Sequence, residues 1–214
     1  MTIAFHPDIA TLMAFSAGSL EEPYAVVVST HIAMCEACRE QVKRTDLIGG
    51  ALLAAEPKAA MSDGALDRLT AALDAADVAP VPVAPSSTVP APVARYLPDG
   101  IDGIRWRFSG PGVAVADLPS SKTAKGRLML LKVAAGRKVP EHSHGGQELT
   151  LILRGAYRDR FGVFATGDIA DHDEDVEHQP IAEPGEDCIC LVAVDAKLSF
   201  RSRLVRTLQP LFGL

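Results

Sequence analysis

The first third of the chain carries apolar residues at the spacing of amphipathic helices. Asp8 follows a proline and favours a helix start, Gly18 favours a stop, and Ser62 is a candidate N-cap for a later segment. The pattern predicts about four short helices, which cover residues 7–20, 21–35, 35–55 and 62–76. A bundle with so few large apolar residues is expected to need an additional staple, such as a metal ion.

The second half of the chain changes to short segments in which apolar and polar residues alternate, separated by glycine-containing turns. Alternation places one face of each segment in a core, and regular turns are typical of an antiparallel sandwich or barrel. The predicted strands cover residues 104–110, 112–118, 126–133, 148–155, 156–164, 188–195 and 198–205.

The two halves are joined by APVPVAPSSTVPAPVA, in which five prolines alternate with small residues. Proline lacks an amide donor and fixes φ, so we expect an extended, semi-rigid spacer. The sequence therefore predicts a two-domain α + β protein, with a helical bundle joined to an all-β barrel. Its expected parts are a helical domain at 1–78, a linker at 79–94, a β domain at 95–200 and a C-terminal tail at 201–214.

Apolar residues make up 48% and charged residues 22% of the chain, as in a soluble globular protein. No apolar stretch approaches the roughly 18 residues that span a bilayer, and the N-terminus shows no export signal. We therefore expect a cytoplasmic protein without membrane contact. In that reducing compartment, closely spaced cysteines favour a metal or redox site over a structural disulfide.

The net charge of −6 lies in the first part of the chain. Residues 1–80 contain five basic side chains against eleven acidic ones, whereas residues 81–214 contain sixteen of each. The acidic excess argues against direct nucleic-acid binding and suits a partner with a basic surface. A solvated helix surface explains it equally well.

His31, Cys35 and Cys38 stand four and three positions apart, which places them on one stripe of a helix. Two thiolates and an imidazole favour zinc, whose structural sites are tetrahedral and take a fourth ligand. His6 is the only other histidine or cysteine before residue 140. We therefore predict a structural zinc site of His6, His31, Cys35 and Cys38. The alternatives are small buried cysteines beside a core histidine, or a thioredoxin-like redox pair.

The stretch from Gly136 to Gly155 reads G-x5-H-x-H-x3-E-x6-G, which matches the first motif of the cupin family. Cupins are small barrels of the double-stranded β-helix type, in agreement with the predicted strands. His142 and His144 lie two apart on a strand and therefore face the same side, and Glu148 enters the next strand.

The segment from Gly167 to His178 keeps the spacing of the second cupin motif, with Asp173 and Asp175 where the family has proline and glycine. The resemblance implies a metal site with four ligands, His142, His144, Glu148 and His178. Three imidazoles and a carboxylate accept zinc, iron or manganese, and we expect zinc. The alternative is a barrel that has lost its metal. His172 is predicted to be a surface residue in the acidic loop.

Cys188 and Cys190 lie two apart on a predicted strand, so both face one side of it. That arrangement is too constrained for a comfortable disulfide. We predict that they are core or barrel-lining residues. A redox role is the alternative, because oxidation of thiols that face the metal cavity would be felt by the site.

The histidine and cysteine pattern on the helical domain resembles the zinc-binding anti-sigma domain of bacteria, and together with the cupin it is similar to the ChrR-type anti-sigma factors. The resemblance implies a 1:1 complex with an extracytoplasmic-function sigma factor and no enzymatic activity. It also implies that the cupin is the sensory part, which releases the sigma factor under photooxidative stress from singlet oxygen or peroxide.

Apolar residues on the helices that a partner could cover are Val26, Val27, Met34 and Leu52. The competing interpretation is a cupin metalloenzyme of the dioxygenase or isomerase type with an N-terminal zinc-bound interaction domain. A zinc-finger DNA-binding protein is a weaker alternative, because the predicted finger lacks a basic recognition helix.

Overall fold

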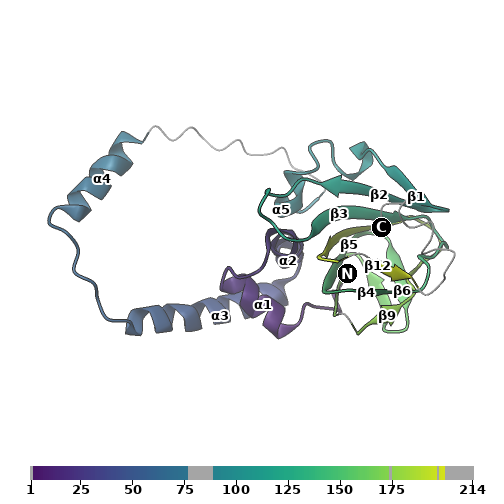
Figure 1. Ribbon diagram of the computed structural model, residues 1–214, viewed down its shortest axis with the longest axis horizontal. Helices are drawn as coiled ribbons and strands as arrows, with labels where there is room; N and C mark the ends of the chain where they lie inside the picture. The colour runs from purple at the N-terminus through teal and green to yellow at the C-terminus, as the bar shows by residue number, and fades with distance from the viewer. Residues whose placement is uncertain (1, 77–88, 174, 197, 201–214) are drawn as a thin grey trace.

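The computed structural model describes residues 2–76, 89–173, 175–196 and 198–200, without the side chains of His144 and residues 198–200. The predicted tail and residues 77–88, which include residues 79–88 of the predicted spacer, lie outside the described residues. The chain forms a β-barrel with helices packed on one side, and one helix stands away from both (Figure 1). The fold class is therefore the predicted one.

Four helices form where the apolar spacing predicts them: α1 (Ile9–Ser16), α2 (Glu22–Met34), α3 (Glu36–Ala55) and α4 (Ala65–Ala75). Asp8 caps α1 by accepting a backbone amide at 2.7 Å, and Gly18 follows its end with a φ of 66°. The expected cap at Ser62 is wrong, because the left-handed Gly64 moves the start of α4 beyond it. Ser62 instead accepts a hydrogen bond from Arg68. Among the described residues, no helix is long and apolar enough to cross a membrane.

The end of the proline-rich segment is helical, so the expectation of an extended spacer is wrong there. Helix α5 (Ala91–Ala94) follows Pro90 and precedes the 3-10 helix η1 (Ile101–Gly103). Pro90 is the N-cap and Pro92 lies in the first turn, where a missing amide costs no helical hydrogen bond. Val93 is fully buried, so this part of the chain belongs to the core.

A six-stranded sheet forms one wall of the barrel, in the order β1 (Arg107–Gly110), β2 (Val113–Leu118), β3 (Arg127–Val133), β11 (Cys188–Val194), β5 (Glu148–Arg154) and β8 (Ile169–His172). Two three-stranded sheets complete it, β10 (Ile181–Ala182) with β6 (Ala156–Asp159) and β7 (Gly162–Ala165), and β12 (Leu198–Phe200) with β4 (His142–His144) and β9 (Glu177–His178). All pairs are antiparallel. The predicted strand 156–164 is the hairpin β6–β7, and periodicity did not predict the short β8, β9 and β10.

Both faces of the six-stranded sheet are buried at its central strands. Alternate side chains of β3, β5 and β11 belong to two apolar clusters, which we call the outer and the inner core. The inner core fills the barrel and includes Met129, Ile152 and Val192. The outer core joins the sheet to α2 and includes Leu130, Leu151, Leu191, Val27 and Val28. The helices and the barrel therefore share one hydrophobic core.

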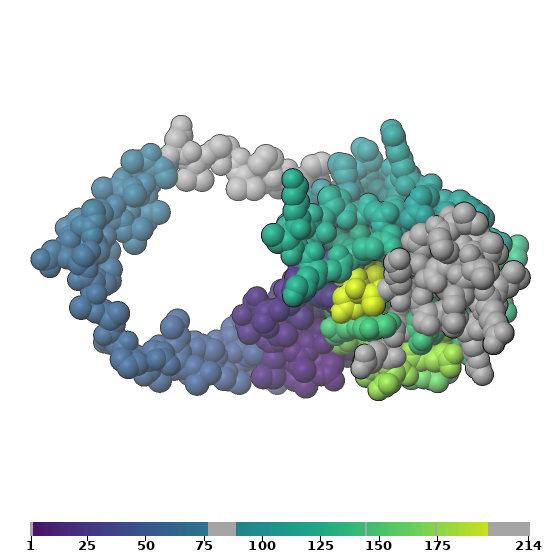
Figure 2. Space-filling model, in the orientation of Figure 1, coloured from purple at the N-terminus to yellow at the C-terminus, as the bar shows by residue number. Residues whose placement is uncertain are grey.

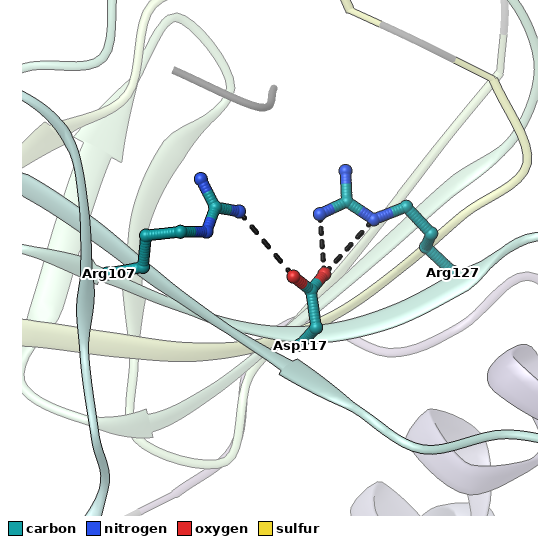
Figure 3. Close-up of polar contacts among 3 residues, drawn as sticks. All are labelled: Arg107, Asp117 and Arg127. Carbon is teal, nitrogen blue, oxygen red and sulfur yellow. Dashed lines mark hydrogen bonds and ion pairs between the residues drawn. The ribbon is translucent and has the colours of Figure 1, made fainter. Parts of the chain in front are cut away.

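Asp117 on β2 connects three strands at the exposed edge of the sheet (Figure 3). Its carboxylate accepts hydrogen bonds from Arg127 at 2.5 Å and from Arg107 at 3.5 Å. Partial burial raises the pKa of Asp117, but the two arginines outweigh it and hold the pKa below its usual range. Such exposed pairs stabilise a fold little, so the packing of the sheet depends on its two cores.

Cleavage within the spacer tests the shared core. With a protease site inserted among residues 79–88, the cleaved chain should elute as one species in gel filtration, because Val27 and Val28 are fully buried in the contact with the barrel. Val28→Asp buries an unpaired carboxylate there and should separate the fragments. The control Val163→Asp, at a position 54% exposed, should leave them together. Separation of the unsubstituted fragments would contradict a shared core.

Candidate metal centres

The side chains predicted to bind zinc lie together in space. His31 Nε2 is 3.3 Å from Cys38 Sγ, and His6 Nδ1 is 3.4 Å from Cys38 Sγ and 3.5 Å from Cys35 Sγ. The four ligand atoms lie within 4.8 Å of one another. His31 and both cysteines are buried, whereas His6 closes the cluster from the exposed side. We call this cluster the first centre.

The spacing of His31, Cys35 and Cys38 suggested one continuous helix, but the structure shows two helices that meet at Cys35. Cys35 separates α2 from α3 and has an extended backbone, with φ −113° and ψ 111°. This bend places Cys38, in the first turn of α3, against His31 in the last turn of α2. Arg39 donates to the carbonyl oxygen of Ile32 at 2.7 Å, which satisfies an acceptor at the end of α2.

His31 is oriented by a contact with the barrel. Its Nδ1–H donates to the carbonyl oxygen of Gly167 at 2.9 Å, so Nε2 carries the lone pair that faces the sulfurs. The side chain has no exposed surface, and burial lowers the pKa of His31 to about 4. A neutral imidazole with its free nitrogen directed at two thiols is the state that a metal ligand requires.

The two thiols fit a zinc ion. Burial is the main cause and the neighbouring Cys35 the second cause that raise the pKa of Cys38 to about 12. The metal-free Cys38 thiol therefore stays protonated. A divalent ion displaces such protons and neutralises the resulting thiolates. Two sulfur and two imidazole ligands form the closed tetrahedral set of structural zinc. The first centre can therefore hold zinc without an open position for catalysis.

His6 is brought to the first centre by residues 2–8, which we call the N-terminal arm. Asp168, just before β8, accepts the backbone amides of Ala4 at 2.7 Å and Phe5 at 3.0 Å. The carbonyl oxygen of Phe5 accepts the amide of Ile169 at 3.3 Å. The arm therefore lies along the barrel, and both histidines of the first centre are positioned by the segment that leads into β8.

The barrel contains a second group of potential ligands. His142, Glu148 and His178 line one cavity inside it, and the rings of His142 and His178 are 4.7 Å apart. His142 and His178 are directly opposite each other on β4 and β9. The side chain of His144, the fourth predicted ligand, lies outside the described residues, although its backbone belongs to β4. We call this group the second centre.

Each described ligand of the second centre is held by a polar neighbour. His142 Nδ1 donates to the carbonyl oxygen of Pro140 at 2.8 Å, and His178 Nδ1 lies 3.0 Å from Asp159 Oδ2. The Thr150 hydroxyl donates to Glu148 at 2.9 Å. Both imidazoles are thus held through Nδ1, an arrangement typical of metal sites that bind through Nε2.

The cavity is small and mostly apolar. Its volume is about 40 Å³, the space of a few water molecules. Cys188 and Cys190 line it, with their sulfurs 3.6 Å apart, and Tyr157 also belongs to the lining. The hydrogen bond with Cys188, and after it burial, raises the pKa of Cys190 well above its usual range, so the Cys190 thiol is protonated in the metal-free barrel.

Known proteins similar to the chain identify its family. Residues 100–197 match the family described as the ChrR Cupin-like domain. Over 213 residues, covering 99% of this chain and 99% of its relative, the sequence is 42% identical to the anti-sigma-E factor ChrR of Cereibacter sphaeroides. The chain belongs to the ChrR family of anti-sigma factors. The chain is also similar to ChrR in the crystal structure of Rhodobacter sphaeroides SigE in complex with the anti-sigma ChrR. That match has a TM-score of 0.79 and 41% identity, and it covers 91% of this chain and 100% of that chain.

The prediction for His172 is wrong in this ChrR-family chain. Its side chain is 6% exposed, and its ring centroid lies 4.8 Å from that of His178. Ala170 and His172 face the barrel interior together, and His172 is directly opposite Glu148 in the sheet. The alternation in IADH carried this signal, but the acidic residues after it suggested a loop.

Asp159 also belongs to the second centre, and the sequence analysis missed it. Tyr157 and Asp159 lie two apart on β6 and both reach the barrel interior. Burial raises the pKa of Asp159, but His178 and a backbone amide outweigh it and keep the pKa below its usual range. Because its carboxylate accepts a hydrogen bond from Nδ1 of His178, Asp159 orients the His178 ring.

Replacing one sulfur ligand tests the first centre. Cys38→Ser should lower the metal content of the ChrR-family chain by one ion, because a hydroxyl is a much weaker zinc ligand than a thiolate. Metal content would be measured by atomic absorption after gel filtration. Cys188→Ser is the matched control, and it should keep the full metal content. An unchanged metal content in Cys38→Ser would exclude Cys38 as a ligand.

The orienting role of Asp159 has its own test. Asp159→Asn should weaken metal binding at the second centre by about 10- to 100-fold, the usual effect of losing such a partner. Chelator competition on the full chain measures the affinity. Asp102→Asn, at a surface carboxylate paired with Arg154, is the control and should change nothing. Equal affinities in the two variants would show that Asp159 does not orient the ligand.

Proposed function

We propose that this chain sequesters an extracytoplasmic-function sigma factor in a 1:1 complex and releases it under photooxidative stress, in the cytoplasm and without binding nucleic acid itself. Membership of the ChrR family and the likeness to ChrR in the SigE complex support the partner class. The observation that carries the proposal is a set of apolar side chains left exposed on the helices.

The exposed apolar side chains lie on α3, α4 and the segment between them, and we call this surface the apolar arm. On α4, three leucines recur three and four positions apart, and no residue of the helix is buried. Figure 2 shows that α4 and the end of α3 extend away from the rest of the molecule. The members of the apolar arm are 56–76% exposed: Leu47, Ile48, Leu52, Leu53, Met61, Leu66, Leu69 and Leu73.

The apolar arm differs from the apolar surface expected from the sequence. Val26 and Val27 are buried in the outer core, and Met34 is half-buried, so these expectations are wrong. Leu52 is exposed as expected, at 67%. A solvent-facing row of leucines is typical of a surface that a partner covers. The net charge of −6 in residues 1–80 suits a sigma factor, whose DNA-binding surface must be basic.

In this proposal the first centre holds structural zinc through His6, His31, Cys35 and Cys38. When bound, the ion would cross-link the N-terminal arm to α2 and α3. The ion would hold the first turn of α3, through Cys38, against α2, and the apolar arm begins further along α3.

The second centre makes the cupin the sensory part of the proposed function. Its ligands would be His142, His144, Glu148 and His178, with zinc as the expected ion and iron or manganese as alternatives. A bound ion supplies a reactive centre beside Cys188 and Cys190. Because the barrel shares its outer core with α2, a change in the barrel can reach the helices that hold the sigma factor.

The alternative function, a cupin metalloenzyme, receives less support. The cavity at the second centre has a volume of about 40 Å³, whereas pockets for organic substrates usually measure hundreds of Å³. That space suits an ion with small oxygen species better than a metabolite. Sequestration therefore explains both the apolar arm and the small cavity.

Charged substitutions on the apolar arm test sequestration. Leu69→Glu and Leu73→Glu should each weaken binding of the chain's own sigma factor by roughly 2 kcal/mol, about 30-fold, if they are interface anchors. Binding would be measured by surface plasmon resonance. Both positions are exposed, at 56% and 65%, so the fold should be unaffected. Val163→Glu on the barrel is the control, and equal binding by all variants would contradict the proposal.

A further inference from the structure

Three aromatic rings connect the cavity of the second centre with the N-terminal arm. The ring of Tyr157 stacks on that of Phe164 with centroids 4.9 Å apart and an interplanar angle of 21°. Phe164 stacks in turn on Phe5, with centroids 4.1 Å apart and an angle of 30°. We call these residues the aromatic stack, and they belong to or pack against the inner core.

The inner end of the aromatic stack faces the second centre. Tyr157 lines the cavity together with His142, Glu148 and His178. Its side chain is 3% exposed, and its hydroxyl has no hydrogen-bond partner within the described part of the chain. A buried hydroxyl of this kind costs free energy unless something in the cavity bonds to it. The position of Tyr157 therefore depends on what the cavity holds.

The outer end of the aromatic stack is directly linked to the first centre. Phe5 is followed by His6, whose Nδ1 lies 3.4 Å from Cys38 Sγ. The backbone of Phe5 forms two hydrogen bonds at the start of β8: its amide donates to the Asp168 carboxylate, and its carbonyl oxygen accepts the amide of Ile169. A shift of the Phe5 ring would therefore displace the backbone next to His6, which is a predicted zinc ligand.

Phe5 packs closely against the barrel at Gly162. A Cβ atom added at Gly162 would lie 2.8 Å from Phe5 Cζ, so only glycine allows the ring to occupy this place. Close-packed groups of this kind transmit small displacements instead of absorbing them. The ring is thus wedged between Phe164 and the backbone of β7.

We propose that the aromatic stack couples the occupancy of the second centre to the hold of the first centre on its metal, with Phe5 as the positioning residue for His6. An occupied cavity fixes Tyr157, and the stack then keeps Phe5 and His6 in place. An altered cavity releases Tyr157, loosens Phe5 and weakens the link between the N-terminal arm and α2. The inference deepens the proposed function, because it names the route by which the cupin state would change the sigma-binding helices.

Metal release from the first centre measures this coupling. The full chain is loaded with Co²⁺, and the thiolate-to-cobalt charge-transfer absorption reports the first centre alone, since the predicted ligands of the second centre contain no sulfur. The rate at which excess chelator removes this absorption is compared between the unsubstituted chain and His142→Ala, which lacks a ligand of the second centre. We expect release about fivefold faster or more in His142→Ala.

The same comparison in a Gly162→Ala background tests the route. The added methyl displaces Phe5 without touching a predicted ligand of either centre, so His142→Ala should then change the release rate by a factor of about one. Gly185→Ala is the matched control, because Gly185 also has a positive φ, 114°, but has no atom within 4 Å of the added Cβ. In that background the fivefold difference should persist.

A second variant covers the case in which Gly162→Ala fails to fold. Phe164→Leu shortens the aromatic stack from within and should also abolish the difference. The proposal is overturned if His142→Ala releases cobalt at the unsubstituted rate, or if the difference survives in Gly162→Ala or Phe164→Leu. The assay contains no sigma factor, so its failure and a failure of sequestration are distinguishable.

Discussion

The structure depends on the burial of both faces of the six-stranded sheet. An ordinary barrel wall exposes one face to water, but β11 (CICLVAV) is buried at every position and β5 at all but its last. The outer face therefore requires a cover, and α2 supplies it with a sequence that is apolar on nearly all sides. α2 and the outer face of the sheet therefore bury their apolar side chains against each other.

This constraint explains where the two metal centres lie. The inward side chains of the sheet include Glu148 and His172, which face the second centre, whereas α2 on the outer side carries His31 of the first centre. The segment before β8 connects the two sides of the sheet. Gly167 accepts a hydrogen bond from His31 and Asp168 accepts one from the N-terminal arm, and the chain then enters the barrel as β8. Because the apolar side chains of α2 are buried in the core, the apolar arm on α3 and α4 is the surface we propose for the partner.

The sequence predicted the ligands better than their surroundings. The spacing of His31, Cys35 and Cys38 suggested three ligands, and His6 was added as the only other histidine or cysteine before residue 140; the structure brings these four side chains together. Burial was predicted less well, since Val26 and Val27 look like a free apolar face until the sheet that covers them is known. The role of Asp159 depends on a contact with His178, nineteen positions away, which no local pattern encodes. The helix Ala91–Ala94 was missed because prolines suggest a linker, although the N-cap and the first turn, where Pro90 and Pro92 lie, tolerate proline.

Native-state hydrogen exchange on the metal-loaded full chain tests the shared core most directly. The amides of Val27 and Val28 in α2 and of Leu191 and Val192 in β11 should exchange with the same free energy of opening, within about 1 kcal/mol, because the helix and the sheet would open as one unit. Exchange in α2 faster by about a hundredfold or more, with β11 still protected, would show that the helix leaves the sheet independently and would contradict the account.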